Sequence, residues 1–396
     1  MMSGQQVVFL SSDPEVLWKN RKPLLRSLDI ELTERCNNNC IHCCINRPEN
    51  DARSKERELI TGEWETVIDE AAALGALNIR FTGGEPLLRD DFADLYLYAR
   101  HRGFRVIVFT NARLITPRIA ELWARVPPLQ KIEVTVYGMK PESCAAVTRN
   151  NDAFAEARRG MDLLLNHGIP FIVKGTVFPP TLPEMEDFIA WASRLPGMDS
   201  SPDFPLFLDL RHRRDSEEKN RHIGALRLSP EEGLRILTRD PDAYRRGRME
   251  LIRRLPSAPD DKIFTCNSHN AICIDAYGKI QYCLALRHPK TVLDIRRNTL
   301  KEMVTEFIPR LREMKSTNPV YLGRCGRCFL RGFCEQCPAK SWIEDGALDQ
   351  PVDTLCRAAH EQAVFLGILK RGEKAWDIKD GRDRICFLEK SFSNRI

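Results

Sequence analysis

The amino-acid sequence predicts an α/β fold, a partial six-stranded barrel of TIM type followed by a loop-rich region. Short apolar runs alternate with amphipathic stretches of helical length from residue 28 to residue 240. Repeated strand–helix units are typical of a parallel sheet with crossover helices, and six units fall short of the eight that close a full barrel. The alternation stops after residue 240. We therefore expect an N-terminal extension at 1–27, the barrel at 28–240 and a second domain at 241–396.

Each unit of the barrel is predicted from its own pattern. The strands are expected where apolar runs are short, at residues 28–32, 78–82, 105–110, 131–137, 171–177 and 206–210. The helices are expected where apolar residues recur on one face, at residues 65–74, 91–102, 116–125, 153–167 and 183–194. Gly75, Gly103 and Gly168 are placed to end three of these helices.

The second domain has a different pattern. Residues 240–254 suit a polar helix or a linker, and residues 271–283 suit a hairpin that turns at Gly278. Two further helices are expected at 300–314 and 353–369. Residues 211–222 carry many charges of both signs, which favours a solvated surface loop.

Composition excludes several classes of function. No apolar run is long enough to span a membrane, and the first residues lack the basic and apolar pattern of a signal peptide. The net charge of +5 arises from 60 basic and 55 acidic residues, which is too mixed to indicate nucleic acid. These observations predict a cytoplasmic protein without a membrane or nucleic-acid partner.

Twelve of the fourteen cysteines gather in two sets, which favours metal ligands over disulfides in a chain without an export signal. Cys36, Cys40 and Cys43 lie in a loop directly after the first expected strand. Iron–sulfur cubes are normally held by four thiolates, so three would leave one iron open to a ligand. The alternative is a structural zinc site completed by His42 or Cys44.

Polar and small residues follow the next strands, at the end where parallel barrels place their active sites. These are Gly83, Gly84 and Glu85 after the second strand, Asn111 after the third, and Thr135, Tyr137 and Gly138 on or after the fourth. The glycines allow a close approach of backbone, and Glu85 offers a carboxylate to an ammonium group. Lys174 and Asp209, at the ends of the last two strands, could be general acids or bases or plain ion-pair partners.

The second set holds enough thiols for two closed sets of four. Its members are Cys266, Cys273, Cys283, Cys325, Cys328, Cys334, Cys337 and Cys356. Two structural zinc sites would also suit this spacing.

The Cys-x3-Cys-x2-Cys loop, with Gly-Gly-Glu-Pro after the second strand, resembles the radical S-adenosylmethionine (SAM) superfamily over residues 24–240. The resemblance implies that Cys36, Cys40 and Cys43 bind a 4Fe–4S cluster, and that reductive cleavage of SAM gives a 5′-deoxyadenosyl radical that abstracts hydrogen from a substrate. It implies that Gly83, Gly84 and Glu85 hold the methionyl amine, and that Asn111 and Thr135 line the cofactor pocket. Arg149 or Arg158 would pair with the carboxylate of SAM. His42 stands where an aromatic residue is common, and Cys44 is expected to be a packed spectator.

The second cysteine set resembles the SPASM extension of peptide- and protein-modifying radical enzymes. By position, this implies a nearer auxiliary 4Fe–4S cluster on Cys266, Cys273, Cys283 and Cys337, and a farther one on Cys325, Cys328, Cys334 and Cys356. One spacing departs from the pattern, because two residues rather than three separate Cys334 from Cys337. Both clusters would be fully ligated by cysteine and would carry electrons.

The SPASM resemblance implies a peptide or protein substrate, so we expect a maturase that installs a crosslink or an oxidation in a ribosomally made peptide. Only residues 1–27 precede the first strand, so a separate leader-binding protein is an expected partner, with flavodoxin or ferredoxin as electron donor. One alternative is radical oxidation of a tetrapyrrole side chain. A sulfatase maturase is a further alternative, disfavoured because Leu284 follows Cys283 where such enzymes carry an aspartate. A zinc-binding interaction protein without catalysis is the alternative from another class.

Overall fold

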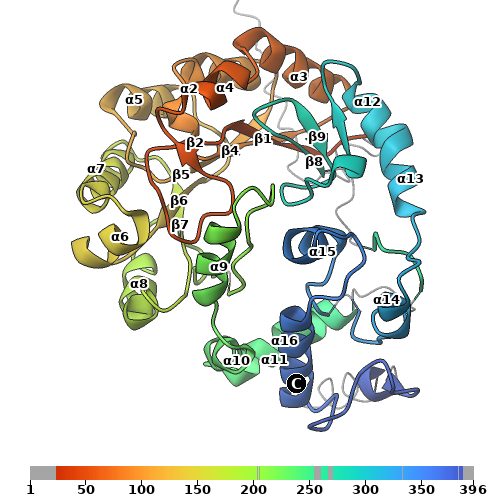
Figure 1. The fold of residues 1–396 in the computed structure, drawn as a ribbon. Coiled ribbons are helices and arrows are strands. Elements are labelled where there is room, and N and C mark those ends of the chain that lie inside the picture. The colour runs from red at the N-terminus through yellow and green to blue at the C-terminus, as the bar shows by residue number, and fades with distance from the viewer. Residues whose placement is uncertain are drawn as a thin grey trace, which may run out of the picture.

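The sheet that organises the molecule has eight strands in the order β10-β9-β8-β1-β4-β5-β6-β7 (Figure 1). The computed structural model describes residues 24–386, apart from 203, 205, 254–259, 266–270, 332 and 382. Five consecutive parallel strands match the first five expected ones: β1 Ser27–Thr33, β4 Asn78–Gly83, β5 Arg105–Thr110, β6 Ile132–Val136 and β7 Phe171–Gly175. The predicted α/β partial barrel is confirmed.

Helices cover the outer face of this curved sheet (Figure 1). The five expected helices are present as α3 Thr61–Ala73, α4 Phe92–His101, α5 Pro117–Arg125, α7 Ala153–Asn166 and α8 Met185–Ala192. Trp64, Tyr96 and Trp123 on their inner faces are almost completely buried. Since these large side chains pack against the strands, burial rather than helix propensity fixes the helices in place. Short elements that the sequence did not predict are α2 Ala52–Arg57, α6 Pro141–Thr148 and the 3₁₀ turns η1 Pro86–Leu88 and η2 Leu182–Glu184.

The sixth strand was predicted at the wrong place. Residues 206–210 form no strand; Leu208 instead packs in a small buried cluster with Phe178 and Ile223, and its carbonyl accepts a hydrogen bond of 2.8 Å from Arg227 Nε. The sixth parallel strand is β8 Ala271–Ile274, which pairs with β1 on the opposite side of the sheet. Thus a strand from the C-terminal third completes the barrel sheet.

The predicted hairpin at 271–283 is confirmed. β8 pairs antiparallel with β9 Lys279–Gln281, and β10 Val292–Asp294 continues the sheet beyond β9. Gly278 at the turn has φ of +83°, a conformation that favours glycine over other residues. The sheet therefore draws on chain from both sides of residue 240.

The remaining helices lie at the open side of the barrel and in the C-terminal third (Figure 1). Their bounds are α9 Glu217–Ala225, α10 Pro230–Leu237, α11 Pro241–Arg253, η3 Pro289–Thr291, α12 Leu300–Glu302, the π-helical η4 Met303–Phe307, α13 Ile308–Arg312, α14 Pro319–Gly323, α15 Pro338–Asp345 and α16 Asp353–Phe365. The expected helix at 300–314 is thus one helical segment with a π turn, and that at 353–369 is α16. A separate small core around Phe333, Ala363 and Leu366 stabilises this third of the chain.

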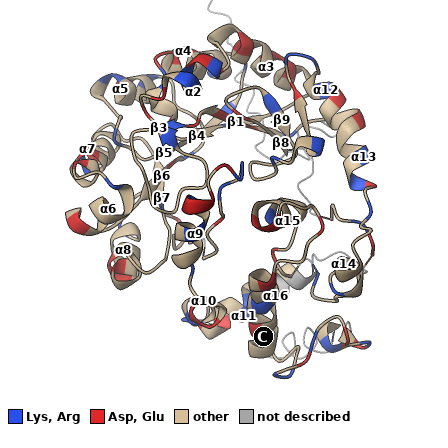
Figure 2. Ribbon diagram, viewed as in Figure 1, with Lys and Arg blue, Asp and Glu red and all other residues tan. Residues whose placement is uncertain are grey.

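Charged residues of both signs are mixed along the outer helices (Figure 2). Within the part of the chain that the structure describes, no helix has the length and apolar character to cross a membrane.

Candidate active site

The first cysteine loop is closed at its base by two short strands. β2 Arg35–Cys36 pairs with β3 Arg47–Pro48, and the amides of Asn39 and Ile41 donate to the carbonyls of Thr148 and Val147 in α6, at 2.9 and 3.0 Å. Cys36 and Cys40 are buried inside the loop and Cys43 is half-buried. Burial, followed by the charge of the neighbouring thiols, raises the pKa of Cys40 well above its usual value. The loop therefore brings three thiols together, and a cationic centre would be needed to keep them deprotonated.

The end of β5 contacts this loop through Asn111. The Asn111 Nδ2 lies 3.8 Å from Cys36 Sγ and donates to Asn37 Oδ1 at 2.8 Å. Glu85 fixes the position of Asn111, because its carboxylate accepts hydrogen bonds from the backbone N–H of Asn111 and from Thr110 Oγ1, both at 2.8 Å. Glu85 is completely buried, and this burial raises its pKa to about 7.

Gly83 and Gly84 let the end of β4 lie directly against the start of the cysteine loop. A Cβ at Gly83 would lie 2.1 Å from the carbonyl oxygen of Thr33, and one at Gly84 would lie 2.2 Å from that of Arg35. Two short backbone hydrogen bonds hold this contact, from Gly84 to Thr33 at 2.7 Å and from Glu85 to Arg35 at 2.9 Å. The Gly-Gly-Glu segment is thus placed beside Cys36, and its glycines are required by backbone packing.

Aromatic side chains close the other side of the loop. Tyr137 is half-buried, and its hydroxyl donates a hydrogen bond to the Cys40 thiol. The ring of His42 packs 4.9 Å from Phe178 and 6.0 Å from Tyr137, and burial lowers the pKa of His42 to about 4. Thr135 is half-buried on β6, in register with Lys174 on β7. The sequence placed Tyr137 at the active-site end of its strand but did not indicate its contact with Cys40.

Two polar atoms next to the cysteine loop are buried without a hydrogen-bond partner among the described residues. They are Asn38 Nδ2 and His42 Nδ1. A buried donor without a partner is costly, so an additional acceptor at this position would stabilise it. The donor set, three thiols with amide donors around them, fits an iron–sulfur cluster whose sulfur atoms accept hydrogen bonds.

The structure separates the two arginines that the sequence left as alternatives. Arg149 ends α6 with φ of +54° and lines a hollow of about 610 Å³ that also contains Cys36. Arg158 instead stacks on the ring of Trp191 at 4.5 Å. Only Arg149 therefore lies beside the first cysteine loop.

The two candidate acid–base residues are both ion-paired. Lys174 pairs with Glu133 on the neighbouring strand, and Asp209 pairs with Lys340 from α15. The His212 ring also approaches Asp209, at 3.5 Å. These contacts favour the ion-pair interpretation for both residues.

The prediction that residues 211–222 form a solvated loop is wrong. The first residues of this stretch are buried against the cysteine loop. Arg211 is 2% exposed, pairs with Asp215 at 2.8 Å, and donates to the carbonyls of Cys43 and Asn46 at 3.4 and 3.3 Å. The His212 amide donates to the Cys44 carbonyl at 3.1 Å. Charge density in a sequence does not reveal that the partners of these arginines are backbone carbonyls far along the chain.

The same segment ties the barrel to the C-terminal third. The Trp342 Nε1 donates to the His212 carbonyl at 3.1 Å, and Arg214 donates to the Trp342 and Ile343 carbonyls at 3.0 and 2.8 Å. These contacts lie on α15, which begins directly after Cys337. The segment thus connects the first cysteine loop to the second set.

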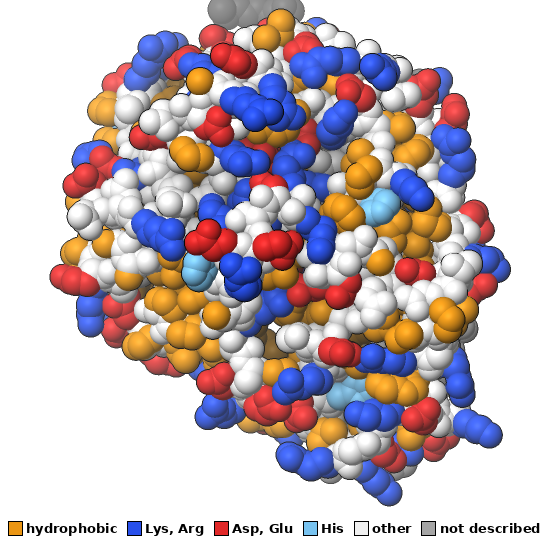
Figure 3. Space-filling view, in the orientation of Figure 1, with side chains coloured by type: hydrophobic (Ala, Val, Ile, Leu, Met, Phe, Trp, Pro, Cys, Tyr) orange, Lys and Arg blue, Asp and Glu red, His pale blue; other side chains and the backbone are white. Residues whose placement is uncertain are grey.

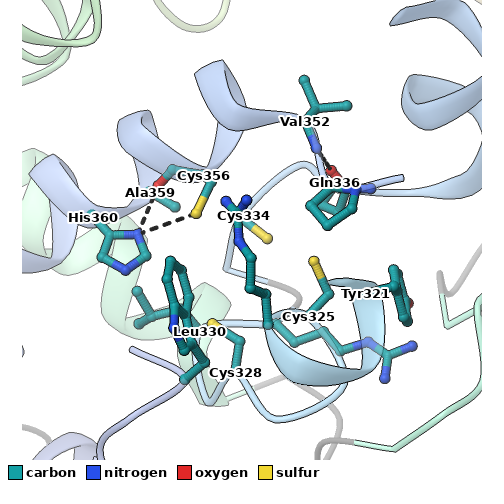
Figure 4. Close-up of a pocket in the computed structure, with 14 residues that line it drawn as sticks. Tyr321, Cys325, Cys328, Leu330, Cys334, Gln336, Val352, Cys356, Ala359 and His360 are labelled. Carbon is teal, nitrogen blue, oxygen red and sulfur yellow. Dashed lines mark hydrogen bonds between the residues drawn. The ribbon is translucent and has the colours of Figure 1, made fainter. Parts of the chain in front are cut away.

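Four members of the second cysteine set line one cavity. Cys325, Cys328, Cys334 and Cys356 surround it, and their sulfur atoms face the same space (Figure 4). Burial, and then repulsion from the neighbouring thiols, raises the pKa of Cys325 to about 12. Arg324 also lines this cavity, and its buried Nε has no hydrogen-bond partner within the described residues, so the donor set fits a cluster here as well.

The other expected set is less complete in the structure. Cys266 lies outside the described residues, while Cys283 and Cys337 are half-buried against the main core. Cys273 lies on β8, paired in register with Asp29, and its strongest electrostatic neighbours are carboxylates, Glu31 first. The assignment of this nearer set stays a prediction.

Comparison with known proteins identifies the domain that contains the first cysteine loop. Residues 30–192 match the Radical SAM superfamily. The chain is 26% identical to the AdoMet-dependent heme synthase of Methanosarcina barkeri, over 80% of this chain and 92% of the relative. It is also 32% identical to the Fe-coproporphyrin III synthase of the same organism, over 40% of this chain and 38% of that one.

Among solved structures, native anSMEcpe with bound AdoMet and the Cp18Cys peptide superimposes with a TM-score of 0.61 at 16% identity. This match covers 92% of this chain and 99% of that one, so the similarity in fold includes the C-terminal third and is consistent with the SPASM type. Residues 30–192 therefore carry the domain of the radical SAM superfamily.

Proposed function

We propose that this radical SAM enzyme abstracts hydrogen from a side chain of a tetrapyrrole. The observation that carries the proposal is the relation to an AdoMet-dependent heme synthase, which extends over 80% of this chain and 92% of that protein. The shorter relation to an Fe-coproporphyrin III synthase points to the same class of substrate. The expected peptide substrate is supported by similarity in fold alone. The radical SAM domain disfavours the alternative of a zinc-binding protein without catalysis.

The first cysteine loop would hold a 4Fe–4S cluster through Cys36, Cys40 and Cys43. With SAM bound, the cluster supplies a 5′-deoxyadenosyl radical that removes a hydrogen atom from the substrate. Asn111 would donate its amide to a cluster sulfur beside Cys36, in the orientation that Glu85 imposes on it. Gly83, Gly84 and Glu85 would hold the methionyl amine, and Thr135 would line the cofactor pocket.

The second cysteine set would hold two auxiliary clusters. Cys325, Cys328, Cys334 and Cys356 already line one cavity, which favours the farther cluster. The nearer cluster would use Cys266, Cys273, Cys283 and Cys337. An electron donor such as flavodoxin or ferredoxin would supply the reducing electron, as a partner in a cytoplasmic setting.

The charges around the first site suit a substrate with carboxylate side chains. The hollow of about 610 Å³ beside Cys36 is lined by Arg47, Arg149, Arg211 and Lys219 against two anionic residues, Glu49 and Asp215. Lys and Arg side chains gather around a recess in the middle of the face drawn in Figure 3. Cationic side chains attract and orient carboxylates, which would bring a tetrapyrrole close to the cysteine loop.

The proposal is tested with anaerobically purified enzyme, SAM, a reductant and Fe-coproporphyrin III. We expect 5′-deoxyadenosine to form faster when the tetrapyrrole is present, together with a change in its mass seen by mass spectrometry. Cys40→Ala should abolish both, whereas Cys386→Ala, at an exposed cysteine, should leave them unchanged. An unchanged tetrapyrrole, with 5′-deoxyadenosine at the rate without substrate, would contradict the proposal.

A further inference from the structure

The cavity of the C-terminal third has a neighbouring histidine that the proposed ligands do not account for. His360 lies one helical turn after Cys356 on α16 and lines the same cavity as Cys325, Cys328 and Cys334 (Figure 4). Its Nδ1 lies 2.8 Å from the Cys356 carbonyl oxygen and 3.6 Å from Cys356 Sγ. The ring is therefore aimed at one of the proposed cluster ligands.

A backbone contact determines which nitrogen of His360 carries the proton. The amide of Ala375 donates to His360 Nε2 at 3.1 Å, so Nε2 must present its lone pair. In a neutral imidazole the proton then resides on Nδ1. The Nδ1–H consequently donates toward Cys356, shared between its carbonyl oxygen and its sulfur.

A cation lies at the same end of the cavity. The Arg324 guanidinium stacks on the ring of Trp376 at 4.9 Å, and the His360 ring meets the same tryptophan edge-on at 5.4 Å. One Nη of Arg324 pairs with the exposed carboxylate of Asp353 at 2.7 Å, and the side chain also hydrogen-bonds to Cys356. Its buried Nε has no partner among the described residues. Trp376 thus holds both donors beside Cys356.

Cys356 therefore has an N–H donor and a cation beside it. His360 Nδ1 lies 3.6 Å from its sulfur, and the Arg324 guanidinium stacks on the same Trp376 ring that contacts His360. Both groups favour extra negative charge at this proposed ligand.

We infer that His360 and Arg324 are positioning residues that raise the reduction potential of the iron–sulfur cluster held by Cys325, Cys328, Cys334 and Cys356. The inference rests on the proposed function for the presence of this cluster. Reduction adds one electron to a cluster, and N–H donors and a nearby cation stabilise the added charge. Without either group this cluster should be harder to reduce.

The test is a redox titration of the full-length holoenzyme, followed by electron paramagnetic resonance. His360→Phe should shift the midpoint potential of one cluster to more negative values and leave the other signals in place. His360→Asn should leave the midpoint potential close to that of the unaltered protein, because the side-chain nitrogen of asparagine can donate from the position of Nδ1. His167→Phe is the matched control, since His167 Nδ1 also contacts a carbonyl one turn earlier, that of Leu163 at 2.9 Å, but faces no thiol.

Arg324→Met provides a second route in case His360→Phe fails to assemble its cluster, and it should shift the same midpoint in the same direction. Unchanged midpoints in both variants, with about twelve irons per chain from three clusters of four, would overturn the inference and leave the proposed clusters standing. About four irons in the unaltered protein would overturn the auxiliary clusters themselves and the inference with them.

Discussion

At the scale of single residues, Asp209 shows how an ion pair determines the role of a carboxylate. Burial alone would raise its pKa, but the contacts with His212 and Lys340 lower the pKa of Asp209 to about 2. A carboxylate that is charged throughout the neutral range is a poor proton acceptor. Because Lys340 belongs to α15, the pair also joins the end of the barrel to the C-terminal third.

We therefore predict that Asp209→Asn lowers the free energy of unfolding at pH 7 by about 2 kcal/mol, the value that a fall in pKa from 3.8 to about 2 implies. The folded-state pKa is lowered, so this stability is present above pH 3.8 and is lost as the pH falls through about 2. Urea unfolding followed by circular dichroism measures the loss. Asp199→Asn, at an exposed pair with Lys131, should have little effect. Lost activity with unchanged stability would instead support a general base.

Whether the position of a site residue can be predicted from the sequence depends on how far along the chain its contact partners lie. The sequence indicated that the cysteines and Gly-Gly-Glu would lie at the same end of the barrel, because each motif is a short segment that follows a strand. The contacts of Arg211 and Arg213 were not, because Arg213 pairs with Glu34 and Asp275, and Arg211 donates to carbonyls near residue 43. Only the folded chain brings these partners together.

At the scale of elements, the contact of β4 with the cysteine loop depends on Gly84. We predict that Gly84→Ala lowers the free energy of unfolding by roughly 1–3 kcal/mol, because its Cβ would lie 2.2 Å from the backbone of Arg35. Backbone cannot rotate away as a side chain can, so the adjacent Cys36 should move and the iron content of the first site should fall. Urea unfolding and iron analysis measure the two effects.

Gly62→Ala is the matched control, since nothing lies within 4 Å of a Cβ at this position in α3. It should preserve the iron content and stabilise the chain by up to about 1 kcal/mol, as alanine does in a helix. Equal behaviour of the two variants would show that the close approach at Gly84 is not required.

The elements predicted best are those whose pattern is local. β1, β4, β5, β6 and β7, with their helices, follow from apolar periodicity. Two failures concern which segments join the sheet. Residues 206–210 have a strand-like composition, yet Leu208 and Leu210 pack in a separate cluster, while the short β8 pairs with β1 across more than 200 residues of chain. The periodicity of apolar residues indicates that a segment can form a strand, but it does not indicate which strand that segment pairs with.

At the scale of the whole molecule, a buried charge network holds the first barrel strand and its loop to the C-terminal third of the chain. Arg287 is almost completely buried and pairs with Glu31 of β1 and with Glu34, each at 2.6 Å. Arg213 reaches Glu34 and Asp275 from the segment before α9. The barrel therefore depends on the C-terminal third for neutralisation of its own carboxylates as well as for its sixth parallel strand.

We predict from this network that Arg287→Met lowers the free energy of unfolding by about 3–5 kcal/mol at pH 8, because it leaves buried carboxylates without their cation. Arg296→Met is the matched control: Arg296 also bridges distant segments, to Glu63, but on the surface, so its loss should cost at most about 1 kcal/mol.

Burial raises the pKa of Glu31 to about 7 even beside Arg287, and without the arginine that pKa should rise further. A raised carboxyl pKa in the folded state costs stability above the unfolded value of 4.5, and protonation relieves that cost as the pH falls. The deficit of Arg287→Met should therefore be smaller at pH 6 than at pH 8 in urea unfolding; a deficit independent of pH, or one equal to that of Arg296→Met, would mean that the carboxylates find another cation.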